Sequence, residues 1–386
     1  ITCRDWSSDV CSSDLVGYAF AEVEPDVTPD PETRRVKIKF NINKGKLAYI
    51  ERIEIVGNDR TRDKVVRREL YIREGDLFSG PGIRQSKELL MRMGYFDDVA
   101  IKWPRRGADD LVIVDIEVKE RMQGNFIIGV GFSSLENFFG TAQVSHNNLF
   151  GYGWKLSLMA EVGAYRKNFQ LQFREPYLFD SRWIFGTTLN NTERDYFSFQ
   201  RKDRGAYVSF GRPLYWDVEA HLGYQYQQVE ITDVDNRAAL FLTLQEGQKI
   251  TTSTRFTLQR DTVNHPFDPT EGAKVSASTE WASENFGGDL NFLKYTVMAR
   301  RYFPVYWGIS LMVNGEAGYA DNLDPGRLPI TERYFLGGLN SVRGFYSRSL
   351  GPTETSFIPY NYQDPTSTMA RSEEHTSELQ SRPVIS

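Results

Sequence analysis

The chain has 386 residues, of which 13% are aromatic, and a formal net charge of −5 at pH 7. No stretch approaches the roughly 18 uninterrupted apolar residues of a membrane-spanning helix, whereas membrane strands, whose apolar residues alternate, are not excluded. Because the chain also lacks a basic block, its charge gives no support to nucleic-acid binding.

Both ends of the chain carry an unusual relation at the level of DNA. Back-translation of residues 371–381 gives a sequence whose reverse complement encodes residues 5–15, and this sequence looks like a sequencing-library adapter. Evolved protein ends have no reason to show such a relation. We therefore expect residues 1–15, which hold Cys3 and Cys11, and residues 371–386 to be adapter-derived and to carry no core pattern.

The first native segment, residues 16–45, has a strand pattern. Gly17–Phe20 opens a strand-like run, Pro25–Thr33 is rich in turn residues, and Val36–Ile42 alternates with period two. The pattern returns about 77 residues later, which indicates tandem modules. Residues 16–45 are therefore expected to be the C-terminal part of one module.

Residues 46–120 contain a complete module. A strand is predicted for Tyr49–Val56, helices for Arg62–Ile72 and Gly82–Met93, and further strands near Phe96 and over Leu111–Val118. Apolar residues spaced by three and four positions predict the helices, and Gly94 is suited to cap the second one. The order strand, helix, helix, strand, strand predicts a small α+β domain.

From Asn125 onward the chain changes to strands of about ten residues with two different faces. In Asn168–Arg174 every odd residue is apolar and every even residue is polar, and Val218–Gln227 and Lys274–Trp281 alternate in the same way. One face could meet lipid and the other a watery lumen. A soluble β-sandwich is the alternative, although its core rarely needs Gln, Glu and Arg along one side of so many strands.

Short turns such as Arg212–Tyr215 alternate with longer loops such as Asp233–Gln248, as in outer-membrane barrels. The runs predict about eleven strands, near 125–133, 138–148, 154–165, 168–178, 182–192, 203–213, 217–231, 249–261, 271–283, 289–303 and 308–320. The first of these is a candidate seam strand formed by Asn125, Phe126, Ile127, Ile128, Gly129, Val130, Gly131 and Phe132. Its glycines weaken packing on one side.

A glycine-rich motif follows the last strand, with Val342, Arg343, Gly344 and Phe345 at its centre. Glycines allow close backbone packing around a guanidinium, which needs fixed acceptors when it is buried. The run from Gly337 to Phe345 resembles the signature of the BamA-like outer-membrane protein assembly factors, the POTRA-barrel superfamily, and residues 261–272 resemble a second hallmark of that family.

The resemblance implies that the motif loop folds back into the barrel lumen. Arg343 is then expected to be held on the inner wall with Phe345 beside it. The family's acidic partners lie on late strands that this chain lacks. Arg343 is therefore expected to turn to Glu280 or Glu316, or to remain in water.

The resemblance also implies a domain plan and an activity. Residues 46–120 would be a complete POTRA module, and residues 121–370 a truncated barrel with about 11 of the 16 strands of the family. The expected function is nucleotide-independent assembly of outer-membrane β-barrel proteins, through client binding by POTRA modules and strand addition at the barrel seam. Expected partners are unfolded outer-membrane proteins, lipids and accessory lipoproteins, with the POTRA modules in the periplasm.

Chemical motifs give little support to an enzyme. His146, His221 and His265 lack a metal-ligand spacing, and Asp233 and Asp235 lack the glycine and glutamate of a calcium loop. No nucleophile elbow or phosphate loop is present, so neither a catalytic residue nor a cofactor is expected. The alternatives are a two-partner secretion pore of the same superfamily and a barrel lipase, which would need a Ser-His pair.

Overall fold

The computed structural model describes residues 17–20, 22–30, 35–43, 45–106, 110–133, 137–196, 199–235, 240–264, 269–325, 328–338, 342–345, 350, 354–356, 372–374 and 384–385. The chain forms two compact units. Unit 1 comprises residues 1–125 and 146–154, and unit 2 comprises residues 126–145 and 155–386. His265, for which the sequence predicts no metal-ligand role, lies outside the described residues.

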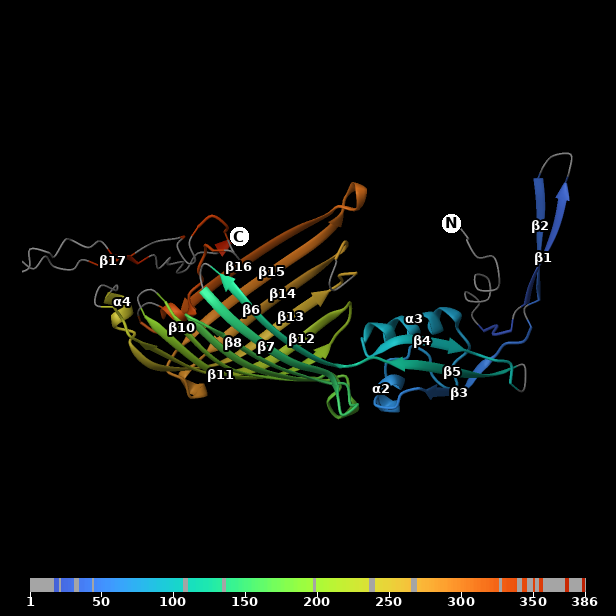
Figure 1. Ribbon diagram of the computed structural model, residues 1–386, viewed down its shortest axis with the longest axis horizontal. Coiled ribbons are helices and arrows are strands. Elements are labelled where there is room, and N and C mark those ends of the chain that lie inside the picture. Colours follow the sequence, from blue (N-terminus) through green and yellow to red (C-terminus); the bar gives the residue numbers. More distant parts are fainter. Residues whose placement is uncertain are drawn as a thin grey trace, which may run out of the picture. The chain divides into compact units, whose positions relative to one another are not determined.

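Unit 1 contains the expected module (Figure 1). Its elements are β3 (Tyr49–Val56), α2 (Asp63–Arg67), α3 (Gly80–Arg92), β4 (Phe96–Lys102) and β5 (Leu111–Glu120). The sheet has the order β3-β5-β4, in which β5 pairs in parallel with β3 and antiparallel with β4. The predicted order of strands and helices is confirmed.

Helix α2 ends earlier than the sequence pattern predicts. It stops at Arg67, whereas a helix to Ile72 was expected. Leu70 and Ile72, two positions apart, are both buried in the core. Residues two positions apart point in different directions on a helix, so a non-helical chain is needed to bury both.

Helix α3 has clear start and stop signals. The Ser79 hydroxyl accepts a hydrogen bond of 3.1 Å from the backbone N–H of Gly82, and a proline lies in the first turn. Ile83 and Leu90 face the core. After the helix, Gly94 has a φ of +73°, which suits the glycine predicted as its cap.

The core of unit 1 lies between the helices and the sheet. In β5 the buried positions alternate, so that Val112, Val114, Ile116 and Val118 all face inward. Phe96 of β4 packs in the same core with 3% of its surface exposed. Phe96 and the inward-facing residues of β5 therefore form the module core.

The segment before the module differs from the prediction. Gly17–Phe20 forms a turn and not a strand; the N–H of Gly17 donates to Phe78 and its carbonyl accepts from Ala48. Strand β1 (Glu22–Asp30) pairs antiparallel with β2 (Arg35–Asn43) and includes prolines where a turn was expected. Both strands of a two-stranded ribbon are edges, where proline is tolerated.

Residues 146–154 also belong to unit 1 although they follow β7 in sequence. The Asn148 side chain is buried; its Nδ2 donates to the Thr61 hydroxyl at 2.8 Å and its Oδ1 accepts from the N–H of Gly153 at 2.7 Å. Gly151, at a φ of +73°, approaches the Arg60 carbonyl so closely that a Cβ there would lie 2.1 Å from its oxygen. This short segment is therefore closely fitted to the module.

Unit 2 is one curved sheet of eleven long antiparallel strands, each paired with its neighbour in sequence (Figure 1). A short strand, β19 (Val384–Ile385), pairs with β16 over two residues. The long strands are β6 (Gly124–Ser133), β7 (Asn137–Leu149), β8 (Trp154–Gly163), β9 (Arg166–Glu175), β10 (Ile184–Asp195), β11 (Gln200–Pro213), β12 (Val218–Thr232), β13 (Gly247–Asp261), β14 (Gly272–Ala282), β15 (Phe292–Pro304) and β16 (Ser310–Asn322). All eleven strands were predicted, with ends that differ by a few residues.

Short elements lie between and after these strands. They are η1 (Leu178–Asp180), α4 (Leu240–Thr243), η2 (Glu284–Phe286), η3 (Tyr306–Gly308), η4 (Ile330–Glu332), β17 (Glu354–Ser356) and β18 (Ser372–Glu374). In the described part of the chain, no helix has the length and apolar character needed to cross a membrane.

The two faces of the unit 2 sheet differ as the alternation predicts. One face, here called the apolar face, exposes large apolar side chains, among them Leu222, Phe256, Trp281 and Val297. The opposite face, here called the polar face, carries Gln, Glu, Arg and Lys from the intervening positions. Soluble proteins rarely expose apolar side chains over so many adjoining strands, which favours contact with lipid.

Candidate functional site

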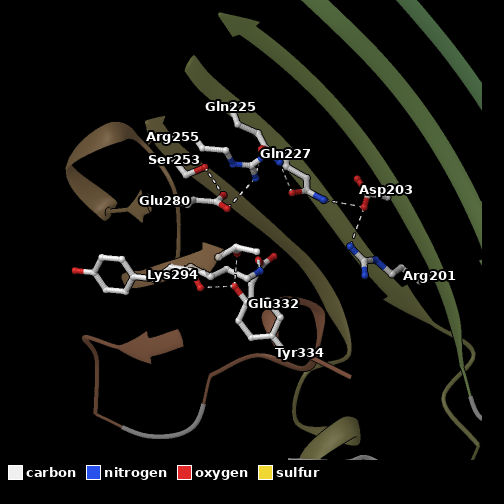
Figure 2. Close-up of polar contacts among 12 residues, drawn as sticks. Arg201, Asp203, Gln225, Gln227, Ser253, Arg255, Glu280, Lys294, Glu332 and Tyr334 are labelled. Atoms are coloured by element: carbon white, nitrogen blue, oxygen red, sulfur yellow. Dashed lines mark hydrogen bonds and ion pairs between the residues drawn. The ribbon is translucent and has the colours of Figure 1, made fainter. Parts of the chain in front are cut away.

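The polar face of β12 to β14 carries a hydrogen-bonded charge network (Figure 2). Arg255 and Glu280 are register partners on β13 and β14, and their side chains form an ion pair of 2.8 Å. Glu280 is 7% exposed and its second oxygen accepts from the Ser253 hydroxyl at 2.7 Å. The carboxylate is therefore held from both sides, as a buried charge requires.

The network continues toward β11. The amide of Gln225 accepts from Arg255 at 3.1 Å and donates to Gln227 at 2.8 Å. Gln227 in turn donates to Asp203, which also binds Arg201, both at 2.8 Å. The neutral amides of β12 thus connect an ion pair on β11 with the ion pair between β13 and β14, and the hydrogen bonds order these side chains.

A second cluster on the same face anchors a segment that follows β16. Lys294 of β15 donates to Glu332 of η4 at 3.2 Å, and the two side chains are only 17% and 8% exposed. Tyr334 adds a hydroxyl contact of 2.5 Å to Thr296 and a hydrogen bond of 2.9 Å to the Tyr295 carbonyl. Figure 2 shows Lys294, Glu332 and Tyr334 close together.

The anchored segment, residues 328–336, fits the wall closely. Leu328 and Ile330 are buried, and the N–H of Ile330 donates to the Gln245 side chain at 2.9 Å. The Tyr334 ring lies against Gly318 of β16, where a Cβ would come within 2.5 Å of the ring. A larger residue at that position would therefore displace the ring.

The glycine-rich motif extends from this anchored segment. A backbone bridge between Leu336 and Leu350 closes the base of the loop. Within it, the N–H of Gly338 donates to the Val342 carbonyl at 3.2 Å, and Gly344 has a φ of +89°. Glycine adopts this conformation without steric cost.

Arg343 and Phe345 are exposed, and Val342 is half-buried. Of the three expected outcomes for Arg343, pairing with Glu280 is not observed, because Ser253 and Arg255 hold that carboxylate, and the exposure of Arg343 agrees with the outcome in water. Among the described residues no contact joins Arg343 to Glu316 either. The fold-back of the motif into a lumen remains a prediction.

Strand β6, the candidate seam strand, lies at one edge of the unit 2 sheet. Phe126, Ile128 and Val130 are 66%, 68% and 90% exposed. Gly131 lies under the Phe139 ring, where a Cβ would be 2.6 Å from a ring carbon. No described strand pairs with the outer side of β6, so this edge presents backbone N–H and C=O groups beside exposed apolar side chains.

The sequence patterns did not reveal Lys294, Glu332 and Tyr334 as anchoring residues. The alternation of polar and apolar residues along β15 does place Lys294 on the polar face, so this residue could have been found from the sequence. The other two lie in an irregular segment without periodicity, so nothing in the sequence connects them with β15.

No group of three or more His, Cys, Asp or Glu side chains suited to a metal ion occurs among the described residues. His146 accepts from the N–H of Asn148, and His221 contacts Glu219 at 3.2 Å. These two histidines therefore have ordinary protein partners.

Two domain families match the chain. The Omp85 superfamily domain matches residues 148–373, more than half of the chain, and the POTRA family, described as the surface antigen variable number repeat, matches residues 48–121. The chain belongs to the Omp85 superfamily. Its fold is a POTRA module followed by an antiparallel β-barrel sheet.

Several named proteins are similar over most of the chain. The outer membrane protein assembly factor BamA of Nitratidesulfovibrio vulgaris is 31% identical over 88% of this chain and 43% of its own length. The BamA of Neisseria meningitidis is 26% identical over 87% of this chain and 44% of its own length. The chain thus spans less than half the length of these relatives.

Solved structures show the same fold. BamA from Haemophilus ducreyi lacking POTRA domains 1–3 superimposes with a TM-score of 0.70 at 24% identity, covering 87% of this chain and 67% of that one. CdiB from Escherichia coli superimposes less well, with a TM-score of 0.55 at 17% identity over 85% of this chain and 63% of that one.

Proposed function

We propose that this protein assembles β-barrel proteins into the outer membrane, as the names of its BamA relatives indicate for those proteins. The barrel lies in the outer membrane and the POTRA module in the periplasm. The module, residues 46–120, binds unfolded clients, and residues 121–370 form the membrane part. No nucleotide, cofactor or catalytic residue takes part.

The observation that carries this proposal is the edge position of β6. Its outer backbone N–H and C=O groups lack a neighbouring long strand in the described sheet, and they can pair with the last strand of a client. Phe126, Ile128 and Val130 extend the apolar face up to this edge. A client strand added here would continue the alternation of the sheet and enter lipid already paired.

The anchored segment and the motif from Val342 to Phe345 act inside the barrel in this proposal. The Lys294–Glu332 pair fixes the anchored segment on the polar face, and the motif from Val342 to Phe345 extends from it. Accessory lipoproteins are further partners of the assembly. The anchored segment keeps the polar face ordered while the edge strand exchanges partners.

Site-specific crosslinking tests the strand-addition step. A cysteine at Ile128 on the edge strand is expected to crosslink to a cysteine in the last strand of a stalled client. Leu258→Cys, on the apolar face of the interior strand β13, is the matched control and should give little product. Equal crosslinking at both positions would remove the role of β6.

A further inference from the structure

Unit 1 contains a cavity of about 400 Å³ that the proposed function does not use. This volume is in the range of small-molecule binding sites. The cavity lies at the start of β6 and the end of β7, and no acidic side chain lines it. The lining residues are Arg60, Met122, Gln123, Gly124, His146, Asn148, Phe150 and Gly151.

The unpaired side-chain amide of Gln123 is the first observation that points to a ligand. Its side chain belongs to a residue that is only 8% exposed, and its buried Nε2 has no hydrogen-bond partner. Leaving a buried donor unpaired is costly, and native proteins rarely do so. The Gln123 carbonyl accepts from the N–H of Asn147, which fixes the backbone beside the cavity. The amide has almost no accessible surface, so its side chain must turn toward the cavity before an entering acceptor oxygen can satisfy it.

Two further donors line the same space. The Nδ1 atom of His146 accepts from the N–H of Asn148 at 3.2 Å, so the neutral ring carries its proton on Nε2 and can donate it. The Arg60 guanidinium makes no ion pair with any described residue, while the Arg60 backbone N–H is held by Glu120 at 3.0 Å. Donors without carboxylates favour an anion.

Apolar side chains border these donors. Met122 is 84% exposed and Phe150 is 72% exposed. An inorganic anion would make no use of them, whereas an amphiphile would contact both the donors and the apolar groups. An acidic peptide would match the donors but not the apolar groups.

We propose that this cavity binds the phosphate head group of a membrane phospholipid. Arg60, Gln123 and His146 donate to the phosphate oxygens, and Met122 and Phe150 contact the acyl chains. This inference rests on the proposed function in one respect, namely that a membrane lies beside the start of β6 and the end of β7. The site would fix unit 1 to the lipid surface.

The test uses the whole chain refolded in maltoside detergent and titrated with dihexanoyl phosphatidylglycerol by calorimetry. We expect saturable binding of one lipid. Arg60→Gln should weaken it about tenfold, which corresponds to about 1.4 kcal/mol. Arg73→Gln, which removes an exposed arginine elsewhere in unit 1, is the matched control and should leave the affinity unchanged.

Inorganic phosphate and a tetraglutamate peptide test whether the cavity binds a free anion or an acidic peptide in place of a lipid. Both should bind more weakly than the lipid, and Met122→Ser with Phe150→Ser should weaken lipid binding but not phosphate binding. Equal affinity for phosphate and lipid, tighter binding of the peptide, or unchanged lipid affinity in Arg60→Gln would each overturn the proposal. The lipid titration does not measure client assembly. A failure of the proposed function would therefore be seen in the crosslinking experiment and not in this titration.

Discussion

The two units use the same strand alternation in opposite ways. In β5 of unit 1 the apolar positions are covered by helices, and Val114 and Ile116 have no exposed surface. In unit 2 the apolar positions point outward; Val297 of β15 is 47% exposed, whereas Lys294 of the same strand is nearly buried. This difference shows that an alternation with period two defines the two faces of a strand. The structure that packs against the sheet then decides which of the two faces is buried.

The largest expected effect on stability comes from breaking the ion pair that holds the anchored segment on the polar face. Glu332→Ala leaves Lys294 buried without its partner, and loss of one partner of a buried pair costs about 3–5 kcal/mol. The anchored segment should detach and expose Arg333, now 6% exposed, to trypsin. The rate of cleavage after Arg333 measures this release.

Two variants control this experiment. Glu284→Ala removes an exposed carboxylate on η2 and should not change cleavage. The double variant Glu332→Leu with Lys294→Met removes both charges and should recover much of the protection, because no unpaired charge remains. If the double variant were cleaved as fast as Glu332→Ala, the ion pair would not be what anchors the segment.

The same substitution in both units sharpens the comparison of apolar positions. Ile116→Ala removes a fully buried side chain in unit 1 and should cost about 2–5 kcal/mol. Ile128→Ala on β6, at a position 68% exposed, should change stability by about 0.5 kcal/mol or less. Hydrogen exchange of the amides of β5 and β6 reports each effect locally.

Equal costs at Ile116 and Ile128 would mean that the outward face is packed as tightly as the module core. The comparison of the two units would then fail. A larger effect at Ile128 would indicate that β6 is covered in the folded protein.

The stability of unit 1 should fall at high pH because of one buried tyrosine, with a somewhat smaller effect than the core substitution. Burial raises the pKa of Tyr95 from 10.0 to about 12, and its hydroxyl donates to the Gly153 carbonyl at 3.3 Å. The neutral phenol is favoured in the folded state, so this stability is complete below pH 10 and is lost as pH rises through about 12. A shift of two units corresponds to about 3 kcal/mol.

Tyr95→Phe removes this titration. Urea midpoints of unit 1 at pH 9 and pH 12 should therefore fall less for the variant than for the parent protein. Other groups titrate in both proteins and cancel in the comparison. A parallel fall would show that Tyr95 is not the source of the alkaline sensitivity.

The sequence predicts the elements of this fold well, because both units consist of strongly periodic segments. Period two located the strands of unit 2, and spacing by three and four located α3. The pattern failed at α2, where Leu70 and Ile72 must both reach the core. Local spacing cannot express that tertiary requirement.

The candidate site was predicted less completely. Its motif, from Val342 to Phe345, is visible in the sequence, and so is the parity of Glu280. The pairing of Glu280 with Arg255 depends on the register of β13 and β14, which the sequence does not determine by itself. The anchoring by Glu332 depends on the path of an irregular segment and was invisible.

The fit of residues 146–154 to unit 1 has a consequence for exchanging modules between related proteins. Thr61 is 1% exposed, and the partner of its hydroxyl, Asn148, lies 87 positions further along the chain. A recombination point between residues 125 and 146 would therefore separate the module from part of its own packing. An exchanged module is expected to fold best when the segment from Asn148 to Gly153 is exchanged with it, because the packing of this module needs two separate pieces of sequence.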